Sequence, residues 1–248
     1  MPVTSQPPPP FTSEDFARNP GDYYRSGYVW QLPVRVTHWV SAIAITLLFL
    51  TGLYIANPVF SPEGEAWRNF LMGWMRKLHF AAGFVFAVSW CTRAYWFFLG
   101  NNYARSGFPM AWKGAWWRNL WRQLWEYLKL KPGPIHLGHN ALAGLSYTIG
   151  VVFLGAFLIV TGFALFSQDA PNGPMNRIFG FLLPLLGGPF RVTSLHLVVA
   201  WFIATFVILH VYIVIYDSTQ YRNGLVSAMI TGRKFYQKKD VVQDTWLG

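Results

Sequence analysis

The stretch VTSLHLVVAWFIATFVILHVYIVIY, from Val192 to Tyr216, has no charged residue and holds two histidines, His196 and His210, fourteen residues apart. A helix needs about 20 apolar residues to cross the hydrocarbon core of a bilayer, so this stretch predicts a membrane-spanning helix. At about 100° per residue both imidazoles leave nearly the same helix face, about 21 Å apart along the axis. Polar imidazoles inside a bilayer cost free energy and usually mark a functional site.

The composition extends this prediction to the whole chain of 248 residues. The sequence is 53% hydrophobic and only 12% charged, whereas soluble domains average about 25% charged residues. The chain is therefore predicted to be an all-α membrane protein, a bundle of four transmembrane helices. The uncharged windows place these helices near residues 36–57, 76–99, 140–166 and 192–216.

The net charge of +10 follows the predicted topology. Most lysines and arginines fall on the membrane side that holds both chain ends, and the positive-inside rule assigns that side to the cytoplasm. We therefore expect a multi-pass protein of the bacterial cytoplasmic (inner) membrane with both termini inside. Because the basic residues follow membrane sidedness and do not form one patch, nucleic acid is not an expected partner.

Outside the spans the sequence predicts three regions: a polar, Pro-rich extension at 1–24, the transmembrane domain at 25–216, and a cytoplasmic tail at 217–248. Residues 112–131 mix tryptophans with lysines and arginines, which favours an interfacial amphipathic helix between helices two and three over a simple basic loop. Residues 178–188 are apolar but too short to span, and predict a re-entrant or interfacial segment.

Topology sorts four of the six histidines by depth. His38 and His210 fall near the cytoplasmic ends of their helices, and His79 and His196 near the outer ends. Haem iron takes two axial nitrogens, which two facing helices can supply, so the two pairs predict two stacked b haems. A metal cluster would require carboxylates or cysteines beside the histidines, and we expect none there. The single cysteine, Cys91, excludes the attachment motif of covalent c-type haem.

Other residues near these histidines allow two interpretations each. Arg35 and Arg93 are possible partners for haem propionates, or side chains that reach lipid phosphates. His139 and Asn140, just before the third span, are candidates to hold a quinone carbonyl, but asparagine is also a favoured helix N-cap. Small residues inside the spans either pack helices or admit a flat macrocycle. These residues are Gly52, Gly83, Gly144, Gly150, Gly155 and Gly162.

Several motifs together resemble the b-type cytochrome subunit of membrane-bound nickel–iron hydrogenases. RVTHWVSAIAITLLFLTG, from Arg35 to Gly52, is similar to that family's first helix, and RAYWFFLGNNYA, from Arg93 to Ala104, is similar to the end of its second helix. The resemblance covers roughly residues 25–236. The remaining matches are Gly138–Asn140 at the third helix, the His196 and His210 spacing in the fourth, and Tyr221–Gly224 with Ile230–Arg233 in the tail.

The resemblance implies a respiratory electron-transfer subunit. Hydrogen would be oxidised outside by a large nickel–iron subunit, and electrons would pass through a small iron–sulfur subunit whose C-terminal transmembrane helix packs against this chain. They would enter at the outer haem and leave the inner haem for ubiquinone or menaquinone. Similarity to the related formate dehydrogenase cytochrome subunit places that quinone beside His139 and Asn140. The chain would also anchor the enzyme in the membrane.

The catalysis of hydrogen oxidation is expected elsewhere, because a nickel site of this type needs several cysteine thiolates and the chain has one cysteine. Two alternatives stay open. The same haems would serve a formate dehydrogenase or a thiosulfate reductase-type complex, or the histidines would only pack the helices of a structural membrane anchor.

Overall fold

A computed structural model describes residues 24–60, 69–129, 136–221 and 224–237. In these residues four helical segments are long and apolar enough to cross a membrane. This confirms the four predicted spans and the helical membrane class. The segments are Leu32–Ala56, Leu71–Leu99, Ala141–Asp169 and Pro189–Gln220.

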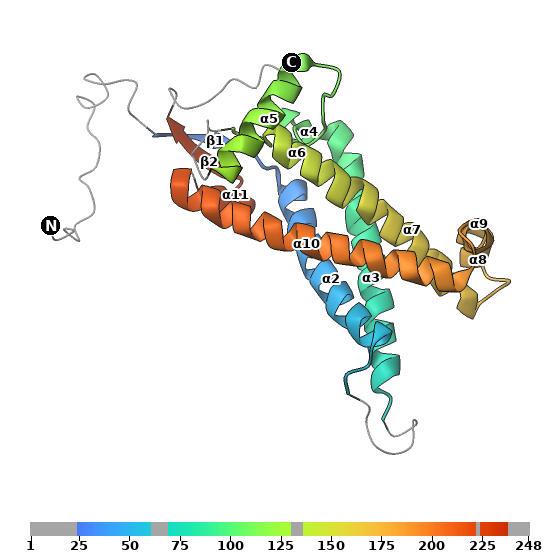
Figure 1. Cartoon of the computed structure of the whole chain (residues 1–248). Coiled ribbons are helices and arrows are strands. Elements are labelled where there is room, and N and C mark those ends of the chain that lie inside the picture. Colours follow the sequence, from blue (N-terminus) through green and yellow to red (C-terminus); the bar gives the residue numbers. More distant parts are fainter. Residues whose placement is uncertain (1–23, 61–68, 130–135, 222–223, 238–248) are drawn as a thin grey trace, which may run out of the picture.

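The first two spans are the helices α2 (Leu32–Ala56) and α3 (Leu71–Leu99). Pro33 lies in the first turn of α2, where its missing N–H breaks no helical hydrogen bond. The two helices lie side by side and cross the pair formed by α7 and α10 (Figure 1). The crossing brings α2 into contact with α10. Both helices carry histidines, His38 in α2 and His196 and His210 in α10.

The third span consists of three continuous helical segments, because a π-helical turn interrupts the α-helix. The segments are α6 (Ala141–Tyr147), the π-helix η1 (Thr148–Leu154) and α7 (Gly155–Phe166). Trp90 of α3 donates its indole N–H to the Val151 carbonyl at 3.0 Å, which satisfies a backbone group inside this π segment. Such turns occur frequently at functional sites. A Cβ on Gly150 would lie 3.1 Å from the Phe206 ring, so the glycine lets α10 approach closely here.

The fourth span, α10 (Pro189–Tyr221), is one unbroken helix. His196 and His210 are therefore on a single rod, about 21 Å apart along its axis, as the spacing predicted. Before α10 the chain forms a short 3₁₀ turn at Ser167–Asp169 and two short helices, α8 (Pro174–Phe179) and α9 (Leu182–Leu185). The end of α8 and the whole of α9 lie in the segment 178–188, which was expected to be too short to span.

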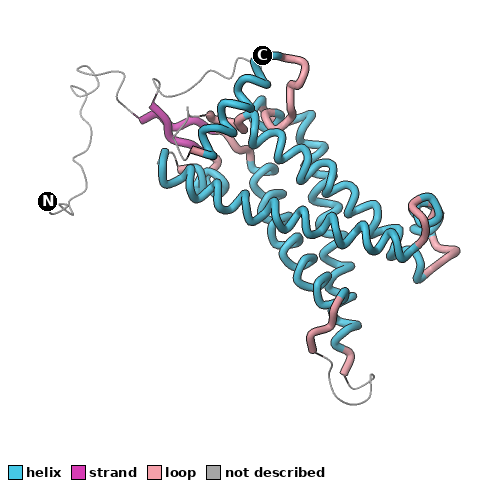
Figure 2. The backbone as a smooth tube through the Cα atoms, in the orientation of Figure 1, coloured by secondary structure: helices cyan, strands magenta, loops and turns pink. Residues whose placement is uncertain are grey.

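The two described ends of the chain meet in a structure that the sequence did not predict. Strand β1 (Tyr24–Tyr28) pairs antiparallel with β2 (Arg233–Gln237), with Gly27 opposite Lys234. We call this pair the β ribbon (Figure 2). Gly232 precedes β2 with φ +81°, a left-handed conformation in which a Cβ would lie 2.7 Å from the Trp30 carbonyl oxygen.

Short helices lie at the same end of the bundle as the β ribbon (Figure 1). They are α4 (Asn102–Arg105), α5 (Gly114–Leu128) and α11 (Leu225–Thr231). A buried cluster holds this end together, formed by Val29, Trp30, Val34, Ala104 and Ala228. The first part of the predicted tail is therefore folded against the start of the bundle. The division of the chain into three regions, with boundaries near residues 24 and 216, stays a prediction.

The segment with many tryptophans forms the helix α5. Trp116 and Leu120 are buried against α6, whereas Trp121 and Trp125 are more than half exposed. One apolar face thus packs on the protein, and a second row of indole rings faces outward beside lysines and arginines. The helix itself is present, and its position in the lipid headgroup layer stays a prediction.

Candidate functional site

The structure brings His38 of α2 and His210 of α10 together. Their ring centroids are 6.3 Å apart, with the ring planes inclined at 56°. Phe206 stacks on His210 at 5.9 Å, and Trp39 contacts the edge of His38 at 5.2 Å. In the described part of the chain, His38 Nδ1 is buried without a hydrogen-bond partner. We call these two residues the inner pair.

The spacing of the inner pair fits one metal atom between two imidazoles. A bond from a transition metal to an imidazole nitrogen is about 2.0–2.1 Å long. Two imidazoles on opposite sides of one metal therefore have their bonding nitrogens about 4 Å apart and their ring centres farther apart than that, which the observed 6.3 Å satisfies. Among the described residues, no three His, Cys, Asp or Glu side chains gather into a metal site. Two protein ligands alone suit a metal whose other positions are filled by a macrocycle, as in haem.

The other two predicted ligands, His79 of α3 and His196 of α10, form the outer pair. Each is held by a threonine from a neighbouring helix. Thr51 of α2 contacts His79 Nδ1 at 2.9 Å, and Thr161 of α7 contacts His196 Nδ1 at 2.8 Å. The two imidazoles are close enough to interact electrostatically. Sequence reasoning missed both threonines, although each precedes a glycine, Gly52 or Gly162, that it had singled out.

Both predicted arginines turn toward the protein. Arg93 donates through Nη2 to the Ala104 carbonyl at 2.8 Å and lies over the Tyr147 ring at 5.4 Å. Arg35 donates through Nη1 to the Ile230 carbonyl. Within the described residues, Arg93 Nη1 and Arg35 Nε are buried without a hydrogen-bond partner. A buried, unpaired N–H of a cation is costly, so each arginine is suited to an anionic group at this end of the bundle.

A third cation at this end, Lys234, was treated in the sequence as an ordinary charge of the tail. The β ribbon places it inside the fold, where it is only 3% exposed. Its ammonium lies 5.4 Å from the centre of the Trp30 ring and donates to the His136 carbonyl at 3.4 Å. No local pattern marks this lysine as buried, because its burial depends on pairing with β1 at the other end of the chain.

His139 is packed between Trp30 and Tyr147, with ring centroids 5.0 and 5.6 Å away. This burial, followed by the positive charges of Lys234 and Arg93, lowers the pKa of His139 to about 3. The imidazole is therefore neutral near pH 7.

A serine sets the tautomer of His139. Ser106 donates its hydroxyl proton to the Tyr103 carbonyl at 2.7 Å and lies 3.0 Å from His139 Nδ1. Since the hydroxyl proton is already used, Nδ1 donates to the serine oxygen, and Nε2 is left as an acceptor.

Asn140 caps the third span, one of the two roles that the sequence allowed. Its Oδ1 accepts from the Ala143 N–H at 2.7 Å at the start of α6. Its Nδ2 donates to the Tyr127 hydroxyl at 3.3 Å, which in turn donates to Asp217 at 2.8 Å. The sixth histidine, His136, is buried against Gln123 of α5 at 3.0 Å.

The glycines inside the spans have separate roles. Gly52 and Gly162 lie against the outer histidines, Gly150 against Phe206, and Gly144 against the backbone of Gly107. Gly83 and Gly155 make ordinary packing contacts, with a Cβ 3.5–3.9 Å from the nearest side chain. Helix packing therefore explains several of them without any macrocycle.

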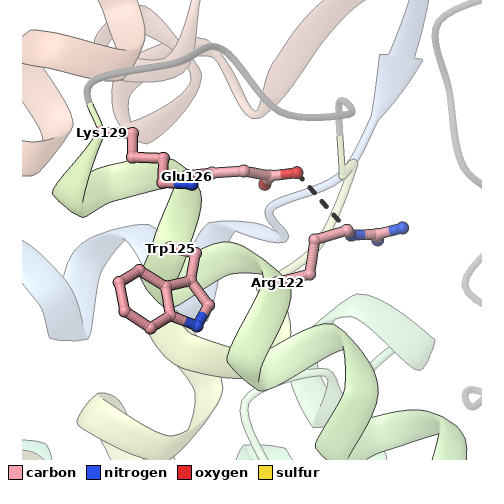
Figure 3. Close-up of a pocket in the computed structure, with 4 residues that line it drawn as sticks. All are labelled: Arg122, Trp125, Glu126 and Lys129. Atoms are coloured by element: carbon pink, nitrogen blue, oxygen red, sulfur yellow. Dashed lines mark ion pairs between the residues drawn. The ribbon is translucent and has the colours of Figure 1, made fainter.

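A surface pocket of about 460 Å³ lies on α5, and none of these histidines lines it. It is lined by Arg122, Trp125, Glu126 and Lys129, and the first and third form an ion pair at 3.7 Å (Figure 3). Its open, basic and aromatic character differs from the buried imidazole pairs. The chemistry of the molecule is therefore expected between the helices and not in this pocket.

Comparison with known proteins decides the family. Residues 29–232 match the family described as prokaryotic cytochrome b561. The chain belongs to this family. It is thus a multi-pass membrane protein of the b-type cytochrome class, and the matched region contains all six histidines.

Three relatives of this cytochrome b561 family member are similar over most of both chains. A "Probable Ni/Fe-hydrogenase B-type cytochrome subunit" of Azotobacter chroococcum mcd 1 is 38% identical over 85% of this chain and 89% of its own. The protein of the same name from Cupriavidus necator is 37% identical, over 88% and 90%. The "Probable Ni/Fe-hydrogenase 1 B-type cytochrome subunit" of Escherichia coli K12 is 35% identical, over 86% and 92%. The resemblance inferred from the motifs is therefore confirmed.

Proposed function

We propose that this chain transfers electrons across the bacterial inner membrane through two b haems, from a nickel–iron hydrogenase to quinone, and anchors that hydrogenase. The main support is the position of the inner pair, whose ring centroids are 6.3 Å apart on two crossing helices. The chain is also a member of a cytochrome b family. A bound haem supplies a one-electron carrier whose potential the protein tunes through its axial ligands and their hydrogen bonds.

The proposed axial ligands follow the two pairs. His38 and His210 would hold the inner haem iron, and His79 and His196 the outer one. Support comes from α10, which carries one member of each pair about 21 Å apart on a single helix. That spacing would put the two proposed sites near opposite faces of a hydrocarbon core of about 30 Å.

Three cations are proposed to hold the propionates of the inner haem. Arg35 and Arg93 are supported by their buried, unpaired N–H groups. Lys234, which the β ribbon carries to the same end, would add a third positive charge. Charge-assisted hydrogen bonds from buried cations to carboxylates are stronger than neutral ones, so this cluster would orient the macrocycle as well as neutralise it.

The proposed partners are the small iron–sulfur subunit of a hydrogenase, including its C-terminal transmembrane helix, and the large nickel–iron subunit. The names of the relatives support this choice over a formate dehydrogenase or a thiosulfate reductase. Hydrogen oxidation would occur on those subunits, outside the membrane. The end that carries the β ribbon would face the cytoplasm, with the tryptophans of α5 in the lipid headgroup layer.

The quinone, ubiquinone or menaquinone, is proposed to bind beside His139 and Asn140. Because His139 is neutral near pH 7 and its Nε2 is an acceptor, it would accept a hydrogen bond from a hydroquinone hydroxyl. Asn140 retains one amide N–H beyond its contact with Tyr127, which would donate to a quinone carbonyl.

A redox difference spectrum of the full chain in its native membranes tests the proposal. We expect a b-type α band on dithionite reduction and about two haems per chain. Absence of that band would leave only the structural anchor. Reduction of the haems by formate but not by hydrogen would replace the hydrogenase with a formate dehydrogenase.

We predict that Asn140→Ala slows hydrogen-driven quinone reduction about tenfold, the effect of one lost hydrogen bond of about 1.4 kcal/mol, while both haems stay bound. The same change also removes the cap of α6, at about 1 kcal/mol of stability. Asn140→Ser separates the two roles, because serine keeps the cap but has no amide N–H. Full turnover in the serine variant would mean that Asn140 is only a cap.

A further inference from the structure

Two Thr-Gly dipeptides contact the outer histidines in the same way from different helices. Thr51 of α2 lies 2.9 Å from His79 Nδ1, and Thr161 of α7 lies 2.8 Å from His196 Nδ1. Both threonines are buried, at 4% and 1% exposure. Each histidine is on the helix that packs beside its threonine, so one contact joins α2 to α3 and the other joins α7 to α10.

The hydroxyl proton of each threonine is already used inside its own helix. Thr51 Oγ1 lies 2.6 Å from the Leu47 carbonyl, and Thr161 Oγ1 lies 2.7 Å from the Phe157 carbonyl. A carbonyl oxygen only accepts, and a threonine has one hydroxyl proton, so the threonine donates to the carbonyl. Toward the histidine its oxygen can then only accept.

This allocation determines the tautomer of both imidazoles. Nδ1 of His79 and of His196 must carry the proton that the threonine oxygen accepts. In a neutral imidazole the other nitrogen, Nε2, then has a free lone pair. Histidines that bind metals usually donate their second ring N–H to an acceptor in this manner, which orients the ring and raises its basicity.

The glycine after each threonine leaves room for the ring. A Cβ on Gly52 would lie 3.2 Å from His79 Cε1, and a Cβ on Gly162 would lie 3.4 Å from His196 Cε1. Cε1 is the carbon between the two ring nitrogens. A side chain at either position would press on the imidazole and change the direction of Nε2.

The inner pair is held differently. His38 Nδ1 is buried and has no hydrogen-bond partner in the described part of the chain, and the His38 ring contacts the rings of Trp39 and His210. The threonine contact is therefore a property of the outer pair, and a change in it is expected to affect one site only.

We propose that Thr51 and Thr161 are positioning residues for the outer haem, which fix the tautomer and raise the basicity of His79 and His196. The inference rests on the proposed function, since it takes the outer pair as axial ligands. A more basic axial imidazole stabilises the ferric form, so the two threonines lower the reduction potential of the outer haem.

The test measures haem affinity and potential in four threonine variants of the full chain in native membranes. In Thr51→Val and Thr161→Val we expect the outer haem to bind about tenfold more weakly and to titrate at a more positive potential. The inner haem should not change. Thr51→Ser and Thr161→Ser keep the hydroxyl and should restore both values.

Thr46→Val and Thr205→Val are matched controls. Their hydroxyls make the same bond to the carbonyl four residues earlier, at 2.9 and 3.0 Å, but both side chains are exposed, and neither forms a hydrogen bond with a histidine among the described residues. They should leave both haems unchanged. If the valine variants of the outer pair do not accumulate in membranes, Thr51→Ala and Thr161→Ala replace them with the same expected shift.

The outcomes separate this inference from the proposed function. Two bound haems with unchanged affinity and potential in the valine or alanine variants would overturn the role of the threonines and leave the ligation intact. An equal shift in the serine variants would do the same, because the hydroxyl would then not be the cause. A wild-type chain without an outer haem would instead overturn the proposed function.

Discussion

Replacing His196 by alanine is expected to remove the outer haem and keep the inner one, so that the haem bound per molecule of this chain falls to about half. Loss of an outer-shell partner already costs about 10–100-fold in metal affinity, and loss of a direct ligand should cost more. Hydrogen-driven quinone reduction should then fall by more than about a hundredfold, because electrons no longer enter the chain. Dithionite should still reduce the remaining haem, whereas hydrogen should not.

The control for this variant is Phe202→Ala on the same helix. Phe202 is 60% exposed along α10, so its truncation tests for a general effect of removing a large side chain. It should retain both haems and normal turnover. Two intact haems in His196→Ala would show that the pairing of His79 with His196 is wrong.

Replacing His210 by alanine is expected to remove the inner haem and keep the outer one. Quinone reduction should again fall by more than about a hundredfold, since the exit to quinone is lost. Here, however, hydrogen should still reduce the haem that remains, because the entry side is intact. The contrast with His196→Ala therefore orders the two haems along the electron path, which haem content alone does not do.

Leu209→Ala is the matched control for the second variant, because Leu209 is the neighbouring residue and is 55% exposed. It should behave as the wild type. Failure of hydrogen to reduce the remaining haem in His210→Ala, with the hydrogenase still attached, would mean that electrons enter at the inner site. Retention of both haems would instead exclude the pairing of His38 with His210.

The spans and the spacing of histidines along α10 were predictable because they are properties of a single helix. Hydropathy over about 20 residues determines whether a segment crosses a bilayer. Helix geometry then fixes the face and the distance of His196 and His210. The motifs around Arg35 and Arg93 were also local, and they were sufficient to indicate the family that the comparison confirmed.

The β ribbon was not predictable in this way. It pairs Tyr24 with Gln237, and neither segment has the length or the alternation that would mark a strand on its own. The burial of Lys234 follows from this pairing. The pKa of His139 is lowered first by its own burial and then by the charge of Lys234, so only the second contribution depends on the β ribbon. The hydrogen bond to the Val151 carbonyl in the π segment likewise comes from Trp90, a side chain of another helix.

By itself, the sequence determined that this chain has four helices long and apolar enough to cross a membrane, and that two of its histidines lie at two levels of one helix. Periodicity and hydropathy are one-dimensional, and a helix translates them directly into face and level. Only the tertiary structure decided that His38 faces His210 at 6.3 Å and that Thr51 and Thr161 hold the outer imidazoles. These contacts depend on how the helices are rotated and crossed, and many side chains distant in sequence set that packing together.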